Sequence, residues 1–109
     1  MAVFPLRIVF MKVENPSDVP VSVLISVPKK RFRHAIDRNR MKRLVREAYR
    51  VNKHELCDFV SQQDYNIAVA FVCITDNMAT YQIVERSMHK ALLRIMEKLQ
   101  SEIAVQPEA

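Results

Sequence analysis

The sequence predicts an α/β fold of the α+β kind, a two-layer sandwich in which a small, mainly antiparallel sheet of three or four strands carries two helices on one face. Two short segments place successive residues on opposite faces, as half-buried strands do, and a third short apolar segment is also expected to form a strand. Two longer segments repeat apolar residues with the helical period of about 3.6 residues. The order strand, strand, helix, strand, helix places both helices over one sheet face. The 109 residues, half of them hydrophobic, predict one domain with a modest core.

The first two strands are expected at residues 4–13 and 19–27. In the first, Leu6, Ile8 and Phe10 lie on one face, and Arg7, Val9 and Met11 lie on the other. In the second, Val21, Val23, Ile25 and Val27 alternate with Ser22, Leu24 and Ser26. Because only a short polar turn at residues 14–18 separates the two strands, we expect them to form an antiparallel hairpin.

The remaining elements follow a basic loop. Pro28 closes the second strand, and residues 29–34 lead into a helix at about residues 36–53. Its apolar stripe comprises Met41, Leu44, Val45, Ala48 and Val51. A third strand is expected at residues 65–73 and a long amphipathic helix at about 79–103. We expect residues 105–109 to form a frayed tail.

The composition argues against several classes of protein. The sequence has no glycine, which phosphate-binding loops and dinucleotide-binding motifs require for close backbone approach. It has no long apolar run and no signal-peptide pattern, so we expect a cytoplasmic protein that does not bind a membrane. Cys57 and Cys73 lack the paired spacing of zinc ligands, so buried thiols are expected instead of a metal site or a disulfide.

Positive charge is concentrated in one quarter of the chain. The net charge is +5, but residues 29–54 alone hold eleven Lys and Arg against two acids, a net of +9. Within the first helix, Arg38, Lys42, Arg46 and Arg50 recur every four residues and therefore form one ridge. Such a ridge repels itself in water unless a polyanion binds and releases counterions.

An ordinary solvated helix face is the alternative interpretation of this ridge. Solvated faces usually mix charges of both signs, as the second helix does. Its cations are Arg86, Lys90, Arg94 and Lys98, and its acids are Glu85, Glu97 and Glu102. We therefore favour nucleic-acid binding for the first helix.

Two runs of residues resemble the signature of the bacterial ribonuclease P protein component. The run Ser26-Val27-Pro28-Lys29-Lys30 ends a strand in a lysine doublet. Residues 35–47 then read Ala-Ile-Asp-Arg-Asn-Arg-Met-Lys-Arg-Leu-Val-Arg-Glu, a helix bearing Arg-Asn-Arg, Lys-Arg and Arg-Glu. The order of elements is also similar to that of the family, so the resemblance covers nearly the whole chain. It implies a fold like that of ribosomal protein S5 domain 2.

The resemblance implies an accessory subunit of the endoribonuclease ribonuclease P, which matures the 5′ end of tRNA. In that family the RNA subunit hydrolyses the phosphodiester bond with magnesium ions, so we expect no catalytic residue, metal site or cofactor in the protein alone. The implied partners are the catalytic ribonuclease P RNA and the 5′ leader of precursor tRNA, and we expect a monomeric protein.

The family motif assigns RNA contacts residue by residue. By resemblance they fall on Lys29, Lys30, Arg38, Asn39, Arg40, Lys42, Arg43 and Arg46. Arg31 in the same loop and Arg50 at the end of the ridge complete the predicted RNA-binding set. Glu47 is better interpreted as a structural partner of Arg43 or Arg50.

The resemblance also implies a cleft for the leader, formed by the sheet and an N-terminal helix. The open sheet face would present Arg7, Ser22, Ser26 and Asn66 around small residues such as Ala68 and Ala70. Coverage of this face by a further element is equally compatible with the sequence. Family members normally begin with a basic helix ahead of the first long strand, whereas this sequence starts within that strand, so we expect it to be truncated.

Other functions stay open at this point. A ribosomal-protein-like RNA-binding module or RNA chaperone is the main alternative, since a fold does not fix a function. A stand-alone nuclease is disfavoured because no acidic cluster suits two-metal hydrolysis. A helix lying in the major groove of DNA is a third possibility.

Overall fold

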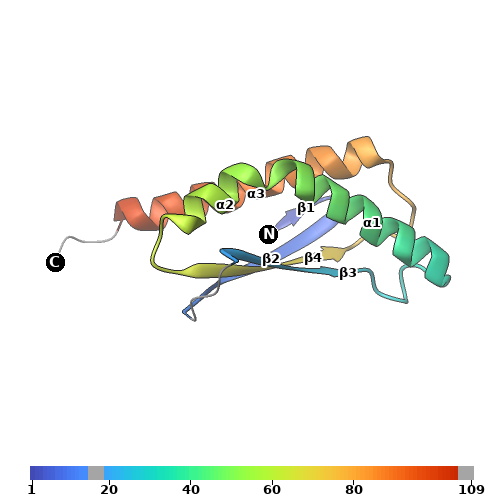
Figure 1. Cartoon of the computed structure of the whole chain (residues 1–109). Helices are drawn as coiled ribbons and strands as arrows, with labels where there is room; N and C mark the ends of the chain where they lie inside the picture. Colours follow the sequence, from blue (N-terminus) through green and yellow to red (C-terminus); the bar gives the residue numbers. More distant parts are fainter. Residues whose placement is uncertain (15–18, 106–109) are drawn as a thin grey trace.

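Four strands form one mixed sheet, and three helices cover one of its faces (Figure 1). The computed structural model describes residues 1–14 and 19–105, with side chains through residue 101. In chain order the elements are β1 (Ala2–Val3), β2 (Leu6–Val13), β3 (Val21–Ser26), α1 (Ala35–Asn52), α2 (His54–Ser61), β4 (Asn66–Cys73) and α3 (Tyr81–Val105). The expected two-layer α+β fold is confirmed. Residues 15–18 of the turn predicted at 14–18, and residues 106–109 of the tail predicted at 105–109, lie outside the described residues, whereas residue 105 ends α3.

The predicted hairpin between the first two long strands is wrong. The strand order is β1-β2-β4-β3, so β4 separates β2 from β3, pairing antiparallel with β2 and parallel with β3. The reason lies in β4, which alternates fully buried residues with Ala68, Ala70 and Val72, and none of its residues is fully exposed. A strand that is apolar on both faces is stabilised most in the centre of a sheet.

The hydrophobic core lies between the sheet and the helices. The sheet contributes alternate residues, as the period-2 pattern predicted, among them Leu6, Ile8, Ile67, Val69 and Phe71. The helix α3 contributes its predicted stripe: Val84, Met88, Ala91, Leu92, Ile95 and Leu99. Ile103, expected in the same stripe, lies outside the described side chains.

The helix predicted at residues 36–53 ends at Asn52, and a second helix, α2, begins at His54. The sequence analysis left α2 unassigned, although Leu56 and Val60 lie four residues apart and are both fully buried. Val51, expected in the buried stripe of α1, is instead 47% exposed and lines an open groove between α3 and the junction of α1 and α2. Within the described part of the chain, no helix has the length and apolar character needed to cross a membrane.

Candidate nucleic-acid interface

The buried stripe of α1 fixes the direction of its cationic residues. Met41, Val45 and Ala48 are completely buried against the core. The helical period therefore turns the intervening residues outward. Asn39, Arg40, Arg43, Arg46 and Arg50 are exposed, and Arg38 and Lys42 are half-buried.

Most of these polar side chains have no hydrogen-bond or ion-pair partner among the described residues. Over residues 1–14 and 19–101, no hydrogen bond or ion pair engages the side chains of Asn39, Arg40, Lys42, Arg43 and Arg46. Their donors are available to an external acceptor. Arg offers a planar fork for phosphate oxygens, whereas Lys offers a compact point charge.

Arg50 differs from the rest of the ridge because it is paired. Its Nε and Nη2 donate to the two carboxylate oxygens of Glu47, one turn earlier. This hydrogen-bonded contact lowers the pKa of Glu47 and raises the pKa of Arg50. Of the two partners expected for Glu47, Arg43 and Arg50, the structure pairs it with Arg50. Because the pair is exposed, solvent screens it, and its main effect is to offset the charge of Arg50 at the end of the ridge.

Arg38 folds back onto the loop that precedes α1. Its Nη1 donates to the carbonyl oxygen of Phe32 at 2.9 Å and to that of Arg33 at 3.1 Å. Phe32 is buried, which anchors the loop in the core and excludes the ring from base stacking. Lys29 and Lys30 project from the same loop and are exposed. Arg38 therefore ties the Arg-Asn-Arg motif to the C-terminal part of the loop that carries the lysine doublet.

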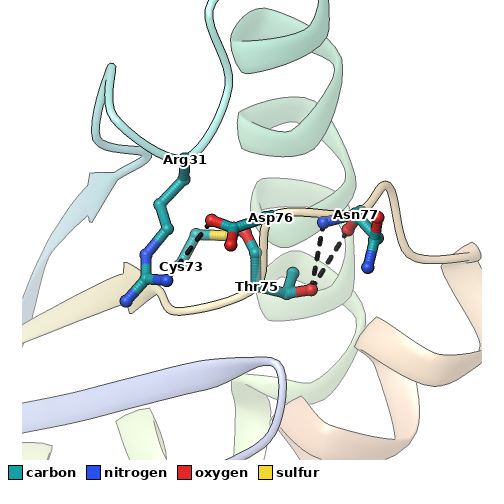
Figure 2. Close-up of polar contacts among 5 residues, drawn as sticks. All are labelled: Arg31, Cys73, Thr75, Asp76 and Asn77. Atoms are coloured by element: carbon teal, nitrogen blue, oxygen red, sulfur yellow. Dashed lines mark hydrogen bonds and ion pairs between the residues drawn. The ribbon is translucent and has the colours of Figure 1, made fainter.

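Arg31 ties the other side of the loop to the connection between β4 and α3. Figure 2 shows its guanidinium directed toward Asp76, and the two groups are 3.3 Å apart. Asp76 lies in a turn in which the backbone N–H of Asn77 donates to Oγ1 of Thr75 at 3.2 Å (Figure 2). Arg31 is therefore ion-paired, in contrast to the unpaired residues of α1.

Cys73 ends β4 beneath this turn and is buried. Its Sγ donates to the carbonyl oxygen of Thr75 at 3.5 Å. Burial raises the pKa of the thiol, so Cys73 stays protonated near neutral pH and packs as a small apolar residue. Cys57 is also a free thiol, and it is half-buried.

The opposite face of the sheet carries the residues predicted for the leader cleft. Arg7 and Ser26 flank Val72 in one row across three strands, Ser22 lies beside Ala68, and Asn66 lies at the far end beside Val13. Ala68 and Ala70 form the floor of a hollow. Its walls include Val9, Met11 and Leu24, which are 54%, 64% and 65% exposed. No element of residues 1–14 or 19–105 covers this face (Figure 1).

Within the described part of the chain, no three His, Cys, Asp or Glu side chains lie close enough together to hold a metal ion. His34 and His54 are exposed at the two ends of α1.

Sequence reasoning missed the contacts that organise the basic loop. Asp76 is 45 residues from Arg31 in sequence, so no local pattern connects the two. The bonds from Arg38 to two backbone carbonyls have no signature in side-chain identity. The only signal in the sequence for an anchored loop was Phe32, because it is a lone aromatic residue among basic ones.

Comparison with known proteins identifies relatives over most of the chain. The family model for ribonuclease P matches residues 3–96. The ribonuclease P protein component of Porphyromonas gingivalis strain ATCC 33277 is 46% identical over 93 residues, which cover 85% of this chain and 68% of that protein. The corresponding protein of Chlorobaculum tepidum is 42% identical over 64 residues, covering 55% of this chain and 42% of the relative. The ribonuclease P protein component of Escherichia coli strain HS is 41% identical over 64 residues, which cover 57% of this chain and 50% of that protein. No solved structure matches the chain.

Proposed function

The chain belongs to the ribonuclease P protein family, and from this premise we propose that it is the protein subunit of ribonuclease P in the cytoplasm. It binds the catalytic RNA and the 5′ leader of precursor tRNA. The observation that carries the proposal is the set of cations on α1 that have no hydrogen-bond or ion-pair partner among the described residues, together with the bonds of Arg38 to the loop that carries the lysine doublet.

The α1 surface suits the catalytic RNA. Arg40, Arg43, Arg46 and Lys42 present unpaired positive charge along one helix. Arg side chains bind phosphates through two parallel hydrogen bonds, and Asn39 can both donate to and accept from sugar or base edges. Lys29 and Lys30 extend the same positive surface beyond the N-terminus of α1.

The open sheet face suits the leader. Its hollow has an alanine floor and apolar walls, which leave room for an extended strand whose bases lie against Val9, Met11 and Leu24. Arg7 lies at one end of the hollow, where its guanidinium can bind a phosphate. In this arrangement the protein contributes binding and orientation, and the RNA subunit with its magnesium ions supplies the hydrolytic chemistry.

Site-specific crosslinking tests the leader assignment. A photoreactive benzoylphenylalanine in place of Leu24 should crosslink to leader nucleotides of a bound precursor tRNA. The same residue in place of Gln62, which is exposed at the end of α2 in the helical layer, should not. Equal crosslinking from both positions, or none from Leu24, contradicts the assignment.

A further inference from the structure

The charged residues of α3 are sorted onto two flanks. Glu85 faces α1, where Nδ2 of Asn52 donates to its Oε1 at 3.2 Å. His89 lies on the same side, with Nδ1 3.3 Å from Oδ1 of Asn52. The other flank carries four cations at four-residue intervals: Arg86, Lys90, Arg94 and Lys98. The prediction that this helix mixes charges of both signs on its exposed face therefore holds only in part. Of the two acids in residues 81–101, Glu85 points toward α1, and Glu97 shares the cationic flank.

An exposed aromatic ring lies beside this flank. Ala2, Val3 and Phe4 line an open hollow together with Arg86, Ser87, Lys90 and Arg94. Oγ of Ser87 donates to the carbonyl oxygen of Phe4 at 2.5 Å and so attaches the turn after β1 to α3. The Phe4 side chain is nevertheless 65% exposed.

The four cations of this flank, three of which line the hollow, have no partner among the described residues. Arg86, Lys90, Arg94 and Lys98 are all exposed. Considering residues 1–14 and 19–101, none of the four makes a hydrogen bond or an ion pair. This differs from Arg31 and Arg50, whose charges are offset by Asp76 and Glu47.

The second cationic flank is separate from the α1 surface. The helices α1 and α3 pack against each other on the side of Asn52, Glu85 and His89, whereas the cations of α3 lie on its other flank; α1 also packs against β3 at one edge of the sheet, and α3 against β1 and β2 on the opposite side. The groove between α3 and the junction of α1 and α2 includes Val51, Leu92 and Leu93 in its lining, and its lining contains no Lys or Arg. A ligand on one surface therefore leaves the other accessible.

We propose that Phe4, Arg86, Lys90, Arg94 and Lys98, which we call the α3 ridge, form a second RNA-binding surface. Unpaired cations one helical turn apart bind successive phosphates, and the Phe4 ring stacks on an unpaired base. This combination favours RNA over an acidic protein segment, which offers carboxylates but no bases to stack. The inference rests on the proposed function, because the RNA is a segment of the same ribonucleoprotein, from either the catalytic RNA or the precursor tRNA.

The salt dependence of RNA binding tests the α3 ridge. The triple variant Arg86→Gln, Lys90→Gln, Arg94→Gln should lower the slope of log affinity against log salt by about two to three, since each neutralised phosphate contributes roughly 0.7–0.9. The charge-preserving variant Arg86→Lys, Lys90→Arg, Arg94→Lys should keep the wild-type slope. Phe4→Ala should weaken binding about tenfold or more without changing the slope, as expected for loss of one stacked base. Glu97→Gln should strengthen binding.

Two binding arms identify the source of the RNA. One measures the protein with ribonuclease P RNA alone, and the other measures precursor tRNA with the assembled complex. A lower slope for the Gln triple in either arm supports the α3 ridge and identifies its ligand. An unchanged slope in both arms overturns the inference. The variant Lys42→Gln, Arg43→Gln, Arg46→Gln is measured in parallel. If only the α3 ridge is wrong, this variant still lowers the slope; if the proposed function is wrong, the wild-type protein binds neither RNA.

Discussion

Replacing Arg38 by lysine should loosen the basic loop while leaving the net charge unchanged. The guanidinium holds two backbone carbonyls, those of Phe32 and Arg33, at 2.9 and 3.1 Å. Lysine has a shorter reach and no planar fork. Hydrogen bonds from charged donors contribute about 1.5–3 kcal/mol when well shielded. Because Arg38 is half-buried and water competes for the same carbonyls, we expect a combined loss of about 1–2 kcal/mol, or roughly 5- to 30-fold in RNA affinity.

Two measurements distinguish this positioning role from direct phosphate contact. Arg38→Lys should bind ribonuclease P RNA more weakly with an unchanged salt slope, and amide hydrogen exchange in residues 31–34 should be faster than in the wild type. Arg46→Lys is the matched control, because the Arg46 side chain makes no hydrogen bond or ion pair within the described residues, and it should leave loop exchange unchanged. Wild-type affinity and wild-type exchange in Arg38→Lys would refute the reasoning.

Three further predictions concern the ridge, the core and pH. Neutralising Lys42, Arg43 and Arg46 together to Gln should lower the salt slope of RNA binding by about two to three, and an unchanged slope would exclude α1 as the contact surface. Phe71→Ala should reduce the free energy of unfolding in urea by about 3–5 kcal/mol, because Phe71 is completely buried; a loss below about 1 kcal/mol contradicts this. Burial raises the pKa of Tyr49 above its ordinary value of 10.0, so stability should fall as pH rises above 10, and Tyr49→Phe should flatten that fall in alkaline unfolding curves.

The strand faces could be predicted from the sequence, whereas the strand pairing could not. Alternation is a local property, so the buried positions Leu6, Ile8 and Val21 follow from their own segments. Pairing depends on competition among all strands, and β4 takes the central place because it is apolar on both faces. The short polar segment between these two strands in the sequence, which suggested a hairpin, was therefore misleading.

The sequence was enough to predict which residues of the candidate interface face outward, but not which side chains they bind. The helical period alone turns Arg43 and Arg46 outward. Side-chain partners depend on contacts between distant segments. Arg31 pairs with Asp76, and Glu85 turns toward Asn52 and leaves the cationic flank of α3 less balanced than its sequence suggested.

Reconstitution tests the central claim most directly. The protein is mixed with a bacterial ribonuclease P RNA at a low magnesium concentration, and removal of the 5′ leader from a precursor tRNA is followed with and without protein. We expect the protein to stimulate cleavage, and the Lys42, Arg43, Arg46 triple Gln variant to stimulate it less at the same protein concentration. Absence of stimulation together with absence of RNA binding would contradict the proposed function.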